Sequence, residues 1–129
     1  MREQASWGKP VDQHRPWPWK VEVQEEGGQL STPAEMQALR LNDAVVVGAP
    51  GEVFVEIGLA IKEKSPLANT FFAGYTNGCI SYIPVPEAYP QGGYEVQQAY
   101  IGYRLPAPVA PQTAELMVNT ALELIGKLQ

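Results

Sequence analysis

Histidine and cysteine are scarce in this chain of 129 residues, which contains one of each. A single cysteine, Cys79, excludes an internal disulfide bond. His14 lies in a proline-rich leading segment, remote in sequence from Cys79 and Ser81. Because the base must reach the nucleophile, the sequence disfavours a Ser-His-acid or Cys-His catalytic pair. One His and one Cys are also too few for an ordinary zinc site formed by this chain alone.

Clustered positive charge is also missing. Nine Lys and Arg residues face fourteen Asp and Glu residues, which gives a net charge of -5, and the basic residues are scattered along the chain. Such a chain repels a phosphate backbone, so we expect no nucleic-acid partner. Phosphate-binding glycine motifs are absent as well, because a proline interrupts Gly48-Ala49-Pro50-Gly51.

Long apolar runs are absent too. Segments such as 44–47 and 71–73 are far shorter than the ~20 residues that a membrane-spanning helix needs. The first residues lack the apolar core of a signal peptide. We therefore expect no transmembrane segment, and the localisation of the protein stays unknown.

The length predicts one domain, in which composition separates residues 1–35 from residues 36–129. All three Trp residues lie in the first nineteen positions, two of them next to prolines, which predicts an extended segment. We expect its indoles to cover the core, with docking to another chain as the alternative. The alternation in Val21–Gln24 predicts one strand, ended by Gly27-Gly28.

The middle of the chain predicts a hairpin followed by a crossover unit. Segments 39–41 and 44–47 are joined by Asn42-Asp43, two residues that tolerate a left-handed backbone. Apolar residues then recur at helical spacing from Val53 to Ile61, before Ser65-Pro66 ends the pattern. The aromatic segment 70–75 predicts a buried strand that ends in a turn at 76–78. Strand, helix and strand in this order predict two parallel strands.

The last third is rich in Pro, Gly and Tyr from residue 83 to 111, which predicts a long irregular excursion with at most short strands. Pro111 suits the first turn of a final helix, whose apolar face should pack on the sheet. The predicted fold class is α/β (α+β): a single domain with a mixed β-sheet, a β-α-β crossover unit, an N-terminal hairpin and two main helices.

Glu52 is the first candidate for a functional residue, because it stands where a β-branched run meets a Pro-Gly break and an apolar helix begins. Loops at the carboxyl edge of a sheet carry the chemistry of open α/β folds. Parallel strands would bring the loop of Glu52 and the loop that begins at Asn77 to the same edge. A purely structural explanation competes with this one, since the helix dipole alone favours an acid in the first turn.

Several segments in order resemble the neutral/alkaline (non-lysosomal) ceramidase-like proteins. They are Ala49-Pro50-Gly51-Glu52 with its following helix, Gly74-Tyr75-Thr76-Asn77-Gly78, Ser81-Tyr82-Ile83-Pro84, Glu87-Ala88-Tyr89 and Gly92-Gly93-Tyr94-Glu95-Val96. The likeness covers about residue 36 to the C-terminus and corresponds to the last part of that family's catalytic domain. Residues 36–129 are therefore expected to form a ceramidase-like C-terminal lobe.

The resemblance implies a zinc ion that activates water to hydrolyse the amide of an N-acyl sphingoid lipid. It implies Glu52 as the carboxylate ligand and Tyr82 as the phenol ligand, with Tyr75 or Tyr89 as alternatives to Tyr82 because the interval looks short. Loop positions expected near a lipid-like amide substrate are Asn77, Gly78, Ser81 and Tyr89. The family's histidine-bearing portion is absent, and two ligands do not make a catalytic zinc site.

Three hypotheses follow. The chain is an inactive C-terminal lobe of a zinc amidohydrolase that needs a histidine-bearing partner lobe, and zinc is a cofactor only in that complex. Alternatively, it is a homo-oligomeric binding or assembly module without catalysis, because a lobe taken from a larger fold exposes apolar surface. The third is an anion pocket formed by free N–H groups after Gly51.

Overall fold

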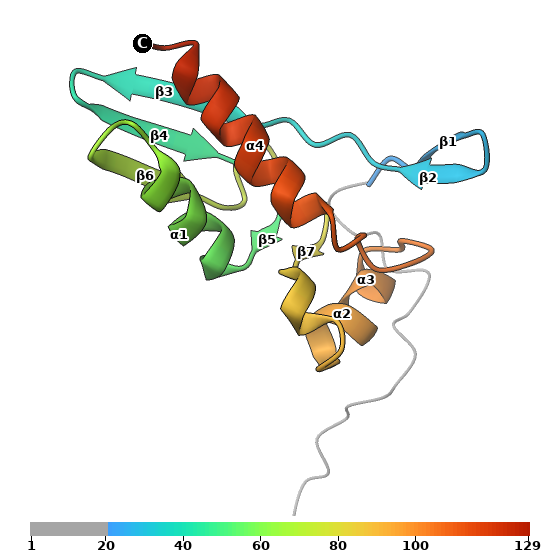
Figure 1. Ribbon diagram of the computed structural model, residues 1–129. Coiled ribbons are helices and arrows are strands. Elements are labelled where there is room, and N and C mark those ends of the chain that lie inside the picture. The colour runs from blue at the N-terminus through green and yellow to red at the C-terminus, as the bar shows by residue number, and fades with distance from the viewer. Residues whose placement is uncertain (1–20) are drawn as a thin grey trace, which may run out of the picture.

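The computed structural model describes residues 21–129, so the prediction for the Trp-rich segment lies outside the described residues. In chain order the elements are β1 (Gln24–Glu26), β2 (Gln29–Ser31), β3 (Gln37–Leu41), β4 (Ala44–Gly48), β5 (Glu52–Val53), α1 (Val55–Lys64), β6 (Asn69–Ala73), β7 (Tyr82–Ile83), the 3₁₀ helix η1 (Pro86–Ala88), α2 (Tyr94–Gln97), α3 (Ala99–Gly102) and α4 (Thr113–Gly126) (Figure 1). Mixed sheets and helices in one small domain confirm the predicted fold class.

The main sheet has the strand order β3-β4-β6. β3 and β4 form the predicted antiparallel hairpin, in which Asn42 takes the left-handed backbone with φ 55°. β4 and β6 are parallel and are joined through α1, as the crossover unit requires. The carboxyl ends of β4 and β6 therefore lie at the same edge of the sheet.

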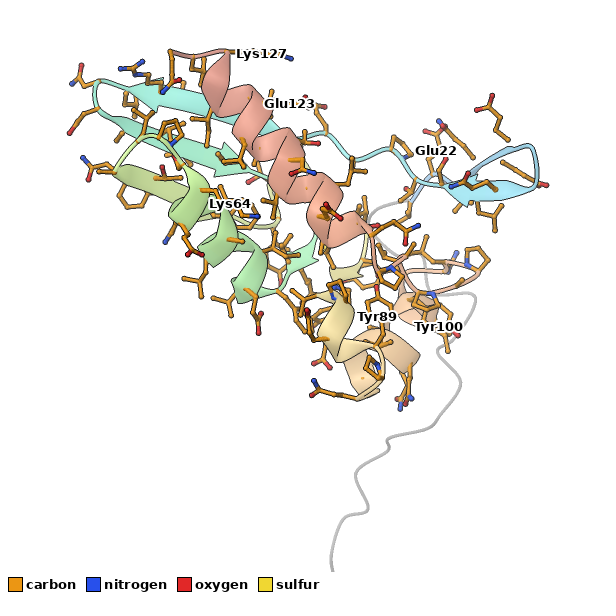
Figure 2. All side chains as sticks on the ribbon, in the orientation of Figure 1. Glu22, Lys64, Tyr89, Tyr100, Glu123 and Lys127 are labelled. Carbon is orange, nitrogen blue, oxygen red and sulfur yellow. The ribbon has the colours of Figure 1, made fainter. Side chains whose placement is uncertain are left out.

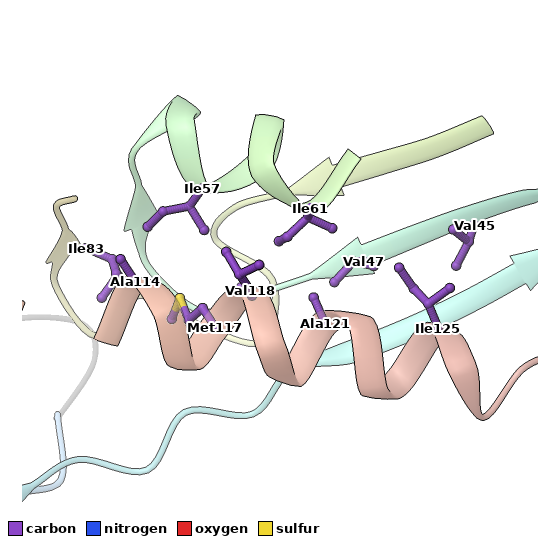
Figure 3. Packing of buried hydrophobic residues seen from close by; sticks show 11 residues of the cluster. Val45, Val47, Ile57, Ile61, Ile83, Ala114, Met117, Val118, Ala121 and Ile125 are labelled. Carbon is purple, nitrogen blue, oxygen red and sulfur yellow. The ribbon is translucent and has the colours of Figure 1, made fainter. Parts of the chain in front are cut away.

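One face of this sheet carries both main helices. Val45 and Val47 of β4 are fully buried beneath Ile57 and Ile61 of α1 and the apolar face of α4. Figure 3 shows the residues of α4 that complete this core, which are Ala114, Met117, Val118, Ala121 and Ile125. Apolar side chains at a spacing of three and four residues give each helix one such face. The two helices and the sheet thus share a single core.

The opposite face of the same sheet is exposed and largely apolar. Arg40 donates to the carbonyl oxygen of Leu128, just after the end of α4, over 2.8 Å, which places Arg40 on the helix side. Its neighbours point the other way because side chains alternate along a strand. Leu39, Val46 and Phe71 are paired across the three strands in one row, and Leu39 and Phe71 are 61% and 55% exposed. We call this row and Leu41 the open sheet face.

A second, smaller sheet follows at the carboxyl edge of the first. It pairs β5 and β7 in parallel, with Glu52 opposite Tyr82 and Val53 opposite Ile83. Ile83 is fully buried in the main core, so this short pair is anchored beneath α4.

The N-terminal part differs from the prediction of one strand in Val21–Gln24. The strand begins at Gln24, and Gly27-Gly28 turns the chain back into a second strand, β2. Both glycines have positive φ values, 58° and 80°, which suit the tight turn of a two-residue hairpin. Residues 24–31 therefore form an exposed hairpin instead of one half-buried strand.

The prediction of a buried strand at 70–75 is wrong in part. β6 spans 69–73 at the edge of the sheet, where Thr70 is buried and Phe71 is exposed. An aromatic run does not distinguish a central strand from an edge strand whose outer face lacks a cover.

The region from residue 83 to 111 contains short helices instead of short strands. η1, α2 and α3 occupy it, and the consecutive helices α2 and α3 contact each other. Within residues 21–129 we find no helix with the length and apolar content that crossing a membrane requires.

Candidate functional site

Glu52 lies on β5, not in the first turn of α1 as the sequence suggested. Gly51 precedes it with φ 136°, and a Cβ at Gly51 would come within 2.9 Å of the carbonyl oxygen of Ser81. That close approach lets the N–H of Glu52 donate to the Ser81 carbonyl over 2.9 Å. The Pro-Gly break therefore creates a new strand, which runs beside Tyr82.

Three phenols converge on the carboxylate of Glu52. Tyr75 donates its hydroxyl to Oε2 over 2.8 Å, and Tyr103 donates to Oε1. Tyr82, the ladder partner of Glu52, brings a third phenol to this carboxylate and helps to lower its pKa. These tyrosines come from three separate segments, so the carboxylate is fixed only when all three are folded together.

Tyr75 reaches the carboxylate from the turn after β6. Backbone hydrogen bonds fasten this turn to the segment after β4: the N–H of Tyr75 donates to Gly51 and that of Thr76 donates to Ala49, each over 3.1 Å. A third bond runs from the N–H of Ala49 to the carbonyl of Ala73 over 3.0 Å. The two carboxyl ends of β4 and β6 are thus joined below the site.

Tyr103, which contacts the other carboxylate oxygen, lies just after α3. It is 9% exposed, and the thiol of buried Cys79 donates to its hydroxyl oxygen over 3.4 Å. Thiol, phenol and carboxylate therefore form a continuous chain of hydrogen bonds from Cys79 through Tyr103 to Glu52. This chain attaches the region of α2 and α3 to β5.

The electrostatics of the site follow from these contacts. Burial alone would raise the pKa of the Glu52 carboxyl. The combined effect of Tyr103, Tyr82 and Tyr75, which lower this pKa, is larger than the effect of burial, so the pKa lies below its ordinary value. The hydrogen bond to Glu52, followed by burial, raises the pKa of Tyr82. Burial is the main cause that raises the pKa of Tyr103. At neutral pH the site is one carboxylate surrounded by neutral phenols.

The other predicted site residues are distributed unevenly. Asn77 and Gly78 are exposed in the turn after Tyr75 with φ values of 62° and 124°. Ser81 is 2% exposed, so it contributes its backbone carbonyl to β5. Tyr89 follows η1, as Figure 2 shows. Its hydroxyl donates to the carbonyl of Val109. The structure thus places Tyr75 and Tyr82 beside Glu52, whereas the hydroxyl of Tyr89 is hydrogen-bonded to Val109.

Sequence reasoning missed Tyr103. The tyrosine-rich composition of residues 89–103 was the available signal, but it does not say which phenol turns inward. Tyr94 was missed as a neighbour of the site. Its ring meets that of Tyr82 edge to face, with centroids 5.9 Å apart and an interplanar angle of 83°.

The N–H groups after Gly51 do not form the open anion pocket of the third hypothesis. The N–H of Glu52 is bonded to Ser81, and the N–H of Phe54 donates to Ile83 over 3.1 Å. Across the described part of the chain, no three His, Cys, Asp or Glu side chains gather closely enough to hold a metal ion.

Comparison with known proteins adds no assignment. No family model matches the chain, and no curated protein or solved structure shows significant similarity to it.

Proposed function

We propose that this chain supplies one side of a metal site, with Glu52 and Tyr82 as oxygen ligands and histidines from a partner lobe as the others. The observation that carries the proposal is the pairing of Glu52 with Tyr82 across two parallel strands. Their backbones are fixed by the β5–β7 ladder, so both side chains start from a defined spacing. A site built on strands holds its geometry better than one built on loops.

The donor chemistry fits zinc in part. Carboxylate oxygen is an accepted zinc ligand, whereas catalytic sites need three protein ligands and an open position. Among the described residues, no cluster of three His, Cys, Asp or Glu side chains forms at Glu52. A histidine-bearing lobe would therefore complete the site, and the bound zinc would activate water for hydrolysis of an amide. The resemblance suggests a lipid-like amide as the substrate.

This chain's own contribution is to hold and orient. The phenols of Tyr75 and Tyr103 take one oxygen each of the Glu52 carboxylate. Hydrogen bonds to a metal ligand fix its orientation, and their loss typically weakens metal binding by roughly 10- to 100-fold. The lowered pKa of Glu52 keeps it ionised, as a metal ligand must be.

The test is a calorimetric titration of the chain with zinc, in buffer with and without imidazole as a stand-in for the missing histidines. We expect imidazole to strengthen binding, and Glu52→Gln and Tyr82→Phe to weaken it by at least about 10-fold. Matched controls are Glu56→Gln, an acid in the first turn of α1, and Tyr100→Phe on α3. Equal zinc affinity in the wild type and in both site variants would contradict the proposal.

The open sheet face favours a second candidate, a homo-oligomeric module without catalysis. Parallel strands are normally covered on both faces, and here Leu39, Leu41 and Phe71 are more than half exposed. In this proposal a second copy covers them. Three strands of five residues span a flat area of roughly 240 Å², well below the ~800 Å² per partner of a stable interface. Such an association would be weak.

A further inference from the structure

Tyr75 has a backbone conformation that its side chain does not favour. Its φ is 57°, in the left-handed region. For a bulky L-residue this region is strained, because Cβ comes too close to the following carbonyl oxygen. Strain of this kind clusters where it serves a function.

The turn itself does not require a tyrosine there. Among the described residues, the other non-glycine positions with positive φ are Asn42, Asn77 and Arg104. Asparagine tolerates this backbone, and Asn77 stands two residues after Tyr75 in the same turn. Glycine or asparagine at position 75 would therefore satisfy the turn with less strain.

Packing does not require the ring either. Tyr75 is 63% exposed, so the burial of its ring contributes little to stability. The specific contact of the side chain is the 2.8 Å hydrogen bond to Oε2 of Glu52. The backbone bonds from Tyr75 to Gly51 and from Thr76 to Ala49 hold the strained residue in place.

We propose that Tyr75 is a positioning residue for Glu52, kept in a strained backbone so that its phenol reaches Oε2. Tyr103 donates to Oε1, so each carboxylate oxygen accepts a hydrogen bond from one of the two phenols. Together these bonds restrain rotation of the carboxylate. This inference rests on the proposed function, since a fixed carboxylate matters where it holds a ligand. Tyr75 therefore orients the carboxylate of Glu52 while its backbone strain lowers the stability of the fold.

The experiment compares Tyr75→Phe, which keeps the strain and removes the hydroxyl, with Tyr75→Gly, which removes both. Asn77→Gly controls for a glycine in the same turn, and Tyr100→Phe controls for the loss of a phenol elsewhere. Two quantities are measured without zinc: the melting temperature, and the rotamer distribution of the Glu52 side chain from NMR couplings.

We expect Tyr75→Gly to melt about 4 °C or more above Tyr75→Phe, because glycine relieves the backbone strain. In both variants the Glu52 side chain should average between rotamers, whereas the wild type and both controls keep one rotamer. A Tyr75→Gly protein that melts at or below Tyr75→Phe would show that the ring supports the fold. An unchanged Glu52 rotamer in Tyr75→Phe would equally overturn the inference. A failed zinc titration would count against the proposed function alone.

Discussion

At the scale of the residue, the sequence predicted Glu52 but not what surrounds it. The acid could be found because a β-branched run, a Pro-Gly break and an apolar repeat meet at one point. Its partner Tyr82 was inferred from a resemblance and from strand direction, and the structure pairs the two residues directly. Tyr103 could not be found, because a contact between positions 51 residues apart leaves no local pattern.

Tyr103→Phe tests the importance of the buried phenol for stability. The variant removes a donor to Glu52 and an acceptor of the Cys79 thiol, which are both at least partly buried. We expect the free energy of unfolding to fall by about 1–3 kcal/mol, because buried polar partners are left unsatisfied. Urea unfolding measures this loss. Tyr100→Phe should change the value by less than about 0.5 kcal/mol. Equal losses in the two variants would contradict a special role for Tyr103.

At the scale of the element, the long periodic segments were the most predictable. α1 and α4 could be identified because their apolar residues recur at helical spacing over ten and fourteen residues. β5 and β7, two residues each, could not, since pairs this short have no periodicity. The sequence pattern also assigned Val53 to the helix, because an apolar residue just before a helix continues the helical spacing of apolar residues. In the structure Val53 belongs to β5.

Gly51→Ala tests the junction that creates β5. A Cβ at this position would lie 2.9 Å from the Ser81 carbonyl and 3.2 Å from Ile83 Cγ1, at a φ of 136°. We expect a loss of about 1–3 kcal/mol in stability, because both the backbone and the β5–β7 contact are strained. Chemical denaturation measures this change in the free energy of unfolding. Gly126→Ala, where a Cβ meets nothing within 4 Å, is the matched control. Wild-type stability in Gly51→Ala would rule out the close approach.

Tyr89→Phe tests the bond that links the end of η1 to the segment before α4. Burial raises the pKa of Tyr89 above its ordinary value. A raised pKa contributes stability that is present below about pH 10, the unfolded value, and is lost as the pH rises through the folded pKa. At pH 7 we expect the variant to be less stable by about 0.5–1.5 kcal/mol, since it lacks the bond to Val109.

The difference between wild type and Tyr89→Phe should then narrow as the pH rises above about 10, because the ionising hydroxyl is present only in the wild type. Urea unfolding at pH 7, 9 and 11 follows this difference. A gap that stays constant or widens with pH would contradict the buried, neutral phenol.

At the scale of the whole molecule, the fold has one covered and one open face. The sequence signals two-sided burial, since Ala44–Val47 is an unbroken apolar run of the kind found in strands covered on both faces. Among the described residues, Leu39, Leu41 and Phe71 of this second face are more than half exposed, and a pattern of apolar residues does not name a covering element. The same limit applies to the proposed metal site, because the histidines that this proposal needs are not among the described residues near Glu52.

Phe71→Ser tests whether the open sheet face mediates self-association. The variant places a hydroxyl at the edge-strand end of the apolar row, in place of its exposed ring, so any concentration-dependent dimer should weaken. Each copy carries a net charge of -5, so added salt should strengthen association by screening repulsion. Sedimentation over a range of concentrations measures both effects. Leu116→Ser, at an exposed position on α4, is the control. A strict monomer at high concentration and high salt would argue against the homo-oligomer.

The most direct test of the central claim is a zinc-edge anomalous difference map from crystals grown with zinc and imidazole. We expect a peak about 2.0–2.2 Å from a carboxylate oxygen of Glu52, with the Tyr82 hydroxyl also in the coordination sphere of the metal. Zinc bound only at other surface carboxylates, with Tyr75 and Tyr103 still bonded to Glu52 and no metal beside it, would contradict this assignment.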